Sequence, residues 1–140
     1  MQFVVDNRIH SSSFLLGRWA LSDVYLKNDA SFPWFILVPR EVNVQEIYQL
    51  SVAQRHVLMD EIATLSVIVE DYFKPEKLNI GALGNIVSQL HIHVVGRFKT
   101  DKAWPQGIWQ PDLTVVPYSA KQGTDLVQIL SKKIMSVSHV

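Results

Sequence analysis

The stretch Gln89-Leu90-His91-Ile92-His93-Val94-Val95 alternates polar and apolar side chains over its first six positions. Successive side chains of a β-strand point to opposite faces, so residues two apart share a face. The alternation therefore predicts a strand over residues 88–98 with one polar face. We expect the other face, which carries Leu90, Ile92 and Val94, to enter a core.

The polar face of this strand has the chemistry of a reactive surface. An imidazole titrates near pH 6.5, so the neutral, nucleophilic form of His91 is well populated at pH 7. Residues two apart on a strand lie about 6.5 Å apart along the chain, a span that a substrate phosphate can bridge. Gln89, His91 and His93 are therefore candidate site residues on a rigid element.

Composition limits the possible functions. The chain has 140 residues, 48% of them hydrophobic, which fits one folded domain and argues against disorder. Its formal net charge of zero does not favour a nucleic-acid polymer or a membrane surface as partner. Without cysteine, disulfides and thiolate metal sites are excluded, which favours a cytoplasmic location. We expect neither a secretion signal at residues 1–6 nor a membrane-spanning segment.

The clearest helix is predicted over residues 52–73. Ser51 and Gln54 have the spacing of a capping box, and Pro75 ends the pattern. Four apolar residues recur on one helical face: Leu58, Ile62, Leu65 and Val69. A second capping pattern, at Ser119, predicts a last helix that reaches about Met135.

Strands are predicted on both sides of the long helix. Before it, short strands are expected at residues 24–27 and 34–38, after a loop that contains Ser11–Ser13. After it, a strand at residues 78–82 is separated by a short turn from the histidine strand, which predicts a hairpin. This order favours an α+β fold with an antiparallel sheet.

These residues resemble the histidine-triad (HIT) family. The resemblance extends from about residue 21 to 109 and includes Asn28-Asp29, Phe32–Arg40, Leu78–Asn85 and the histidine stretch. It implies a five-stranded antiparallel sheet with one long helix, here followed by a C-terminal helix. It also implies a homodimer that binds nucleotides and hydrolyses or transfers nucleotidyl groups. We accordingly assign residues 1–112 to a HIT-like domain and 113–140 to a C-terminal extension, expected to be helical and packed on it.

The resemblance also implies roles for single residues. His91 would attack the α-phosphate, while Gln89 and His93 would hold its non-bridging oxygens. Gln89 replaces the first histidine of the family motif, as in a bacterial branch of the family. Because an amide cannot deliver a proton near neutral pH, a basic leaving group would need another proton source, such as His93 or water.

Other candidates surround the motif. Backbone N–H groups at Gly84 and Asn85 can stabilise developing charge, because glycine allows the main chain to approach closely. Asn79 is a candidate for the leaving group or phosphate, and Asn28 and Asp29 are candidates for the ribose hydroxyls. A weaker candidate for attracting phosphate is Arg97.

Two other classes of function stay open. The first is a nucleotide-binding module with little turnover, which the glutamine at position 89 makes credible. The second is a metal hydrolase with His91 and His93 as ligands, although a catalytic zinc normally takes three protein ligands and no third ligand is evident from spacing. We expect no cofactor and no metal, and a small-molecule nucleotide as the partner.

Overall fold

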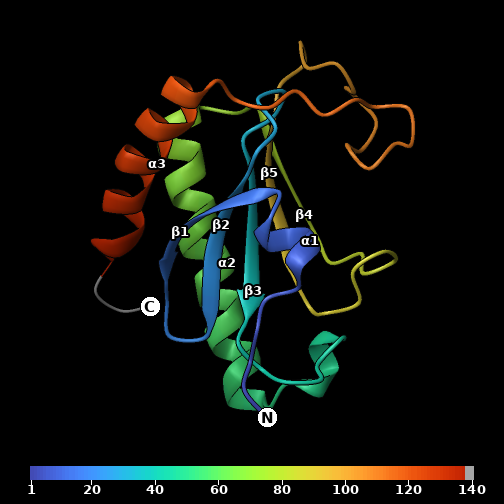
Figure 1. The fold of residues 1–140 in the computed structure, drawn as a ribbon, viewed down its shortest axis with the longest axis vertical. Coiled ribbons are helices and arrows are strands. Elements are labelled where there is room, and N and C mark those ends of the chain that lie inside the picture. The colour runs from blue at the N-terminus through green and yellow to red at the C-terminus, as the bar shows by residue number, and fades with distance from the viewer. Residues whose placement is uncertain (138–140) are drawn as a thin grey trace.

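The computed structural model describes residues 1–137, and the last three residues of the predicted extension, 138–140, lie outside the described part. Its centre is one antiparallel sheet with the strand order β1-β2-β3-β5-β4 (Figure 1). The strands are β1 (Ser13–Arg18), β2 (Ser22–Lys27), β3 (Trp34–Pro39), β4 (Lys77–Gly81) and β5 (Ile92–Arg97). The predicted fold class, α+β with a five-stranded antiparallel sheet, is confirmed.

The long helix α2 (Val52–Phe73) has the bounds that its sequence signals predict. The Ser51 hydroxyl accepts the Gln54 N–H at 3.1 Å, and the Gln54 side chain accepts the Ser51 N–H at 2.9 Å. The helix ends at Lys74 in a left-handed conformation, directly before Pro75. The four predicted core residues of α2 are buried against the sheet.

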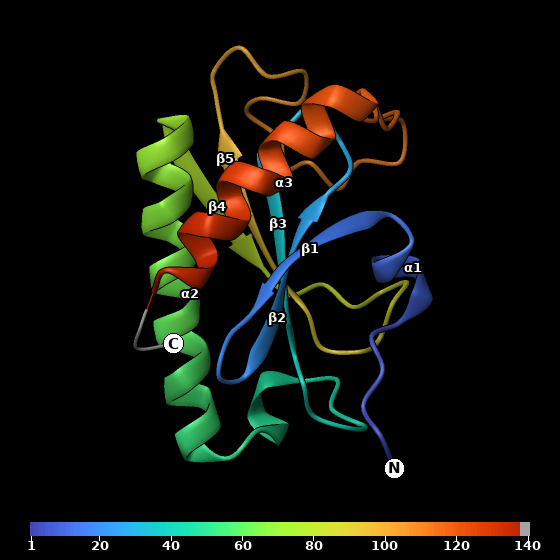
Figure 2. The ribbon, with the colours of Figure 1, turned by 60° about the vertical axis from the view of Figure 1, so that its left-hand side comes forward.

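The C-terminal helix α3 (Ala120–Met135) is also confirmed, with Ser119 as its N-cap. It lies with α2 on one side of the sheet, where it packs on β1 (Figure 2). Gly17 of β1 permits this contact, because a β-carbon there would meet Met135 and Ile134 of the helix. The Trp19 indole donates to the Ile134 carbonyl at 2.8 Å, which fastens the end of α3 to the first hairpin.

The opposite side of the sheet carries the N-terminal segment. Residues 1–6 lead into the short helix α1 (Asn7–His10), whose Ile9 packs on Tyr25 and Ile36 of the sheet. Figure 2 shows α1 on the side of the sheet away from α2 and α3. Neither α1, nor β1, nor the short 3-10 helix η1 (Ile47–Gln49) was expected from the sequence.

The predicted hairpin around Gly84 is confirmed, with a difference in length. β4 and β5 pair antiparallel, with Gly81 opposite His93 and Lys77 opposite Arg97. β5 nevertheless begins only at Ile92, so the predicted strand over residues 88–98 is too long. Gln89 precedes the regular strand, and its side chain binds the N-terminal segment, as described below.

Candidate active site

The histidines lie where β5 begins, on the face of the sheet away from α2. Ile92 and Val94 point into the main core, while His91 and His93 border a cavity on the other face. The two imidazole rings meet edge to face, with centroids 4.9 Å apart. Each histidine is only 7% exposed, so protein contacts control the protonation and orientation of both rings.

A backbone carbonyl determines which nitrogen of His91 is reactive. The His91 Nδ1 lies 2.8 Å from the carbonyl oxygen of Gln89. A carbonyl can only accept a hydrogen bond, so Nδ1 carries the proton in this contact. In the neutral ring the lone pair is therefore on Nε2. This arrangement supplies a nucleophile whose orientation the main chain holds.

The tautomer of His93 is the opposite one. Its Nδ1 lies 2.9 Å from the indole nitrogen of Trp34, which can only donate. Nδ1 is therefore the acceptor, and the neutral ring carries its proton on Nε2. Burial, assisted by the nearby His91 and Lys27, lowers the pKa of His93 to about 3. His93 is thus a neutral hydrogen-bond donor at pH 7 and not an acid ready to lose a proton.

The cavity beside the histidines has a volume of about 540 Å³, within the usual range for small-ligand sites. Its wall is mostly apolar and comes largely from β3, the turn after β4 and the segment that follows β5. The apolar side chains are Ile9, Phe32, Trp34, Ile36, Leu83, Ile86, Val87, Ile108, Trp109, Pro111, Leu113 and Val115. A flat apolar group with a polar tail would fit such a site.

Three predicted site residues besides the histidines lie in this cavity: Asp29, Gly84 and Asn85. Asp29 is buried, and its Oδ1 accepts the Ser31 N–H at 3.0 Å. Among residues 1–137 its Oδ2 has no hydrogen-bond partner, so it is available to a ligand. Gly84 has φ of 74°, a left-handed conformation that favours glycine. Their predicted roles are compatible with these positions and stay predictions.

The other three predicted residues bind protein groups and do not line the cavity. Asn28 accepts the Tyr118 N–H at 2.9 Å and so holds the segment before α3. Asn79 accepts from Arg97 at 2.7 Å. The Gln89 amide binds the main chain of the N-terminal segment through both of its polar groups. The positions of these three residues in the sequence could not show whether their side chains bind protein groups or a ligand.

Arg97 has a structural position, contrary to its suggested role in attracting phosphate. It is 1% exposed, and its guanidinium pairs with Asp101 at 2.8 and 3.1 Å. It also donates to Asn79 and to the Gln106 carbonyl. These contacts fasten the loop after β5, which carries Trp109 to the cavity.

Sequence reasoning missed several residues of the cavity wall. Lys27 lines it, donates to the Ser12 hydroxyl at 2.9 Å and lies 5.4 Å from the centre of the Trp34 ring. Burial lowers the pKa of Lys27. Trp34 and Trp109 also line the cavity, and the Trp109 ring meets the His93 ring with centroids 5.3 Å apart. The two tryptophans that follow the histidine motif, Trp104 and Trp109, were the sequence signal that could have indicated an aromatic part of the cavity wall.

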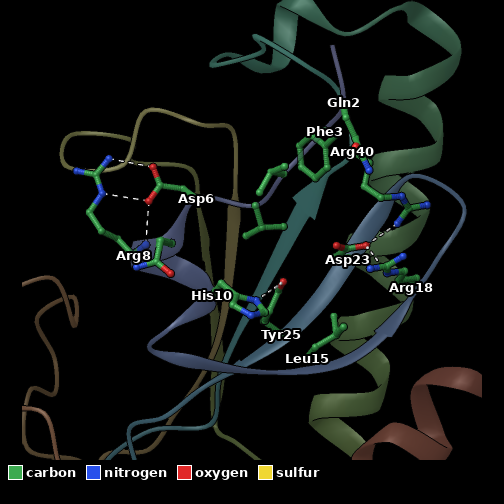
Figure 3. Close-up of a pocket in the computed structure, with 13 residues that line it drawn as sticks. Gln2, Phe3, Asp6, Arg8, His10, Leu15, Arg18, Asp23, Tyr25 and Arg40 are labelled. Atoms are coloured by element: carbon green, nitrogen blue, oxygen red, sulfur yellow. Dashed lines mark hydrogen bonds and ion pairs between the residues drawn. The ribbon is translucent and has the colours of Figure 1, made fainter.

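A second cleft lies on the same face of the sheet, on the other side of the N-terminal segment. Its volume is about 870 Å³, and it contains Asp23 between Arg40 and Arg18 (Figure 3). Asp23 and Tyr25 alternate with Lys27 along β2, so all three share the face of the histidines. Arg8 borders both cavities.

Residues 1–137 have the features of neither a metal centre nor a membrane-spanning protein in the two respects that follow. No three His, Asp or Glu side chains in this part of the chain are grouped so that they could hold a metal ion. None of its helices combines the length and the apolar character needed to cross a bilayer.

Comparisons with known proteins agree with the geometry. The histidine triad protein of Marinobacter aquaeolei is 36% identical with a TM-score of 0.93, over 99% of this chain and 100% of that one. The histidine triad protein of Bradyrhizobium japonicum is 34% identical with a TM-score of 0.90, over 96% and 99%. The diadenosine triphosphate hydrolase of Plasmodium falciparum, solved with cyclomarin A, shares the fold at 14% identity, with a TM-score of 0.63 over 97% and 84%. A comparison with curated proteins found no significant match. The family model described as HIT domain matches residues 10–100, and this chain therefore belongs to the HIT family.

Proposed function

We propose that this protein is a nucleotide-binding hydrolase or transferase that cleaves at the α-phosphate of a nucleotide through a nucleotidyl-His91 intermediate. The observation that supports this most is the 2.8 Å contact of His91 Nδ1 with the Gln89 carbonyl, which leaves the Nε2 lone pair as the nucleophile. The 540 Å³ cavity beside it has room for a nucleotide. Covalent catalysis suits an imidazole, which is both a competent nucleophile and a competent leaving group.

The reaction has two balanced steps. In the first, His91 Nε2 forms a bond to the α-phosphorus, and the bond from phosphorus to the leaving group breaks with its electron pair. In the second, water or another acceptor attacks phosphorus, the P–N bond breaks and the imidazole is regenerated. The attacking water gives its proton to solvent, and the nucleotide departs as the monophosphate.

The cavity residues have distinct parts in this scheme. The His93 Nε2–H and the backbone N–H groups near Gly84 and Asn85 would donate to the non-bridging oxygens, where charge develops. Asp29 would accept from the ribose hydroxyls. Lys27 would add positive charge near the phosphate, since it borders the cavity and influences His93.

The proposed leaving groups are those that depart without strong acid assistance. With a pKa of about 3, His93 is not protonated at neutral pH, and the Gln89 amide has no acidic proton to offer. General acid catalysis typically contributes about 10²–10⁴-fold, so basic amines should leave slowly. The proposed substrates are nucleotidyl phosphoramidates, adenylates or dinucleoside polyphosphates, and among the phosphoramidates those with a basic amine should react most slowly. The diadenosine triphosphate hydrolase above is a protein of this fold whose name states one such substrate.

A nucleotide-binding module with little turnover is the second candidate. The neutral state of Gln89 and His93 favours it, because without an acid at these two positions the covalent step would be slow for substrates with poor leaving groups. Binding without a covalent intermediate would require only the cavity and the ribose and phosphate contacts.

The metal-hydrolase alternative conflicts with the contacts of His93. A metal on Nε2 would force the proton onto Nδ1, which would then face the donating Trp34 indole at 2.9 Å. Two donors at this distance repel each other. Activity that persists in the presence of a chelator would argue further against metal chemistry.

We also propose that the protein forms a homodimer and is located in the cytoplasm. The dimer is supported by exposed apolar residues on the outer face of α2, Met59 at 63% and Val67 at 59% exposure. A second copy could cover this face.

The direct functional test compares the wild type with His91→Ala on a panel of adenylyl substrates. We expect complete loss of turnover with an unchanged circular dichroism spectrum, because the His91 side chain borders the cavity and not the main core. As a control, His56→Ala changes an exposed histidine on α2 and should retain full activity. Near-normal turnover by His91→Ala would refute covalent catalysis by this residue.

A further inference from the structure

The Gln89 side chain binds the N-terminal segment in the manner of a strand partner. Its Oε1 accepts the Asp6 N–H at 2.8 Å, and its Nε2 donates to the Val4 carbonyl at 2.8 Å. Both polar groups of the amide are therefore engaged by main-chain groups two residues apart. Each of these groups keeps one further hydrogen-bonding position, but Gln89 does not line the histidine cavity, so the contacts that its side chain makes are with protein groups.

Building on the proposed function, we infer that Gln89 is a positioning residue that anchors the N-terminal segment and places Arg8 to bind an oxyanion on the leaving group. The substrate class this favours is a nucleotide whose leaving group carries phosphate or carboxylate oxygens. Residues 4–8 precede the stretch that the HIT-domain model matches.

A continuous series of contacts leads from Gln89 to the cavity wall. The Asp6 carboxylate accepts the backbone N–H of Arg8 at 2.9 Å and pairs with its guanidinium at 2.9 and 3.1 Å (Figure 3). Arg8 Nη1 then donates to the Ile86 carbonyl at 3.0 Å, in the turn that contains Gly84 and Asn85. The anchored segment thus supports the turn expected to face the phosphate.

The Asp6–Arg8 pair is connected to the nucleophile by direct contacts. The Asp6 N–H binds the Gln89 side chain, the Gln89 carbonyl contacts His91, and Arg8 lines the same cavity as His91. The hydrogen bond from Arg8 is the largest cause of the lowered pKa of Asp6, which keeps this carboxylate charged and paired at neutral pH.

Arg8 retains the capacity to bind a ligand. A guanidinium has five N–H donors, and three of those of Arg8 are used by Asp6 and Ile86. The side chain is 59% exposed and borders both the histidine cavity and the second cleft. Because Asp6 balances its charge, Arg8 would select ligands by directed hydrogen bonds more than by long-range attraction.

A comparison of two substrates that share the adenylyl group but differ in the leaving group tests the proposed contact between Arg8 and the leaving group. Diadenosine triphosphate has ADP as its leaving group, with phosphate oxygens for Arg8, whereas adenosine 5′-phosphorimidazolide releases imidazole, which has none. The variants are Gln89→Ala, Arg8→Ala and the double variant. Gln49→Ala is the matched control, since the Gln49 amide oxygen also accepts backbone N–H groups, at 2.8 and 2.9 Å, away from both cavities.

We expect either single variant to raise KM for diadenosine triphosphate about tenfold with little change in kcat, since a hydrogen bond between charged groups is worth about 1.4 kcal/mol or more. Kinetics on the imidazolide should stay unchanged, as should those of Gln49→Ala on both substrates. The double variant should be no worse than Arg8→Ala, because Gln89 acts through Arg8. Additive effects, equal effects on both substrates or a fall in kcat alone would overturn the inference.

Further measurements distinguish a loss of the Gln89 contact from a general loss of folding. They also distinguish a failure of this inference from a failure of the proposed function. Gln89→Glu retains the acceptor for Asp6 but sets a carboxylate oxygen against the Val4 carbonyl, so it should behave like Gln89→Ala; wild-type kinetics would contradict anchoring. Hydrogen exchange of the Asp6 amide should accelerate in Gln89→Ala, which removes its acceptor, and unchanged protection in that variant would overturn the inference. If the wild type turns over neither substrate, the proposed function fails, and the same KM pattern is then sought in calorimetric Kd values for diadenosine triphosphate.

Discussion

Lowering the pH from 6.5 to 4.5 should destabilise the fold through His93. In the folded protein the ring is held neutral by burial, with a pKa of about 3, while its Nδ1 accepts from Trp34. In the unfolded chain the imidazole has its ordinary pKa near 6.5. Between these values the unfolded state binds a proton that the folded state does not. The contribution of His93 to stability is therefore complete above pH 6.5 and is lost as the pH falls toward 3.

The size of the effect follows from the proton balance. Each pH unit well inside this window costs about 1.4 kcal/mol per proton. Because the unfolded ring is already half protonated at pH 6.5, the loss between pH 6.5 and 4.5 is about 2 kcal/mol. That is a large share of the roughly 5–15 kcal/mol that stabilises a typical domain.

Urea unfolding at pH 6.5, 5.5 and 4.5 measures this loss, with His93→Gln as the reference. A glutamine oxygen can accept from the Trp34 indole but does not titrate. The wild type should lose about 2 kcal/mol more than the variant over this range. Equal pH dependence of the two proteins, or an NMR titration of His93 with a midpoint near pH 6.5, would refute the reasoning.

Three other outcomes are expected. Ile92→Ala should lower the free energy of unfolding by about 2–5 kcal/mol, while Ile86→Ala, at an 82% exposed position, should change it by less than about 0.5 kcal/mol. Arg97→Ala should cost about 3–5 kcal/mol because it leaves Asp101 buried without its partner; a loss below 1 kcal/mol would contradict that assignment. Light scattering at micromolar concentration should give twice the chain mass, and a monomeric mass would count against the dimer.

The parts of the fold that could be predicted depend on local signals. The capping box at Ser51 and Gln54 and the apolar repeat of α2 lie within one helix, so neighbouring residues suffice to define it. The alternation around His91 likewise distinguishes the core face of β5 from the cavity face without knowledge of the partner strands. Gly84 could be located because the turn after β4 and the histidine motif share one end of a hairpin, whereas Asp29 was suggested by the family resemblance alone.

The parts that were missed depend on contacts between distant segments. Gln89 binds Asp6 across 83 residues of sequence, and no local pattern connects the two. β1 lacks a clear alternation, because a bulge between Leu15 and Gly17 shifts its register. Glu61 interrupts the apolar face of α2 yet is buried, since it accepts the Leu21 N–H of the first hairpin at 2.9 Å.

The central claim is that His91 forms a covalent bond to the α-phosphorus. It is tested most directly by mixing the protein with adenosine 5′-phosphorimidazolide, quenching within the first turnover and measuring the intact mass. We predict a mass gain of one adenylyl group that peptide mapping places on His91 and that His91→Ala lacks. Turnover without any adduct, or an adduct on another residue, would contradict the account.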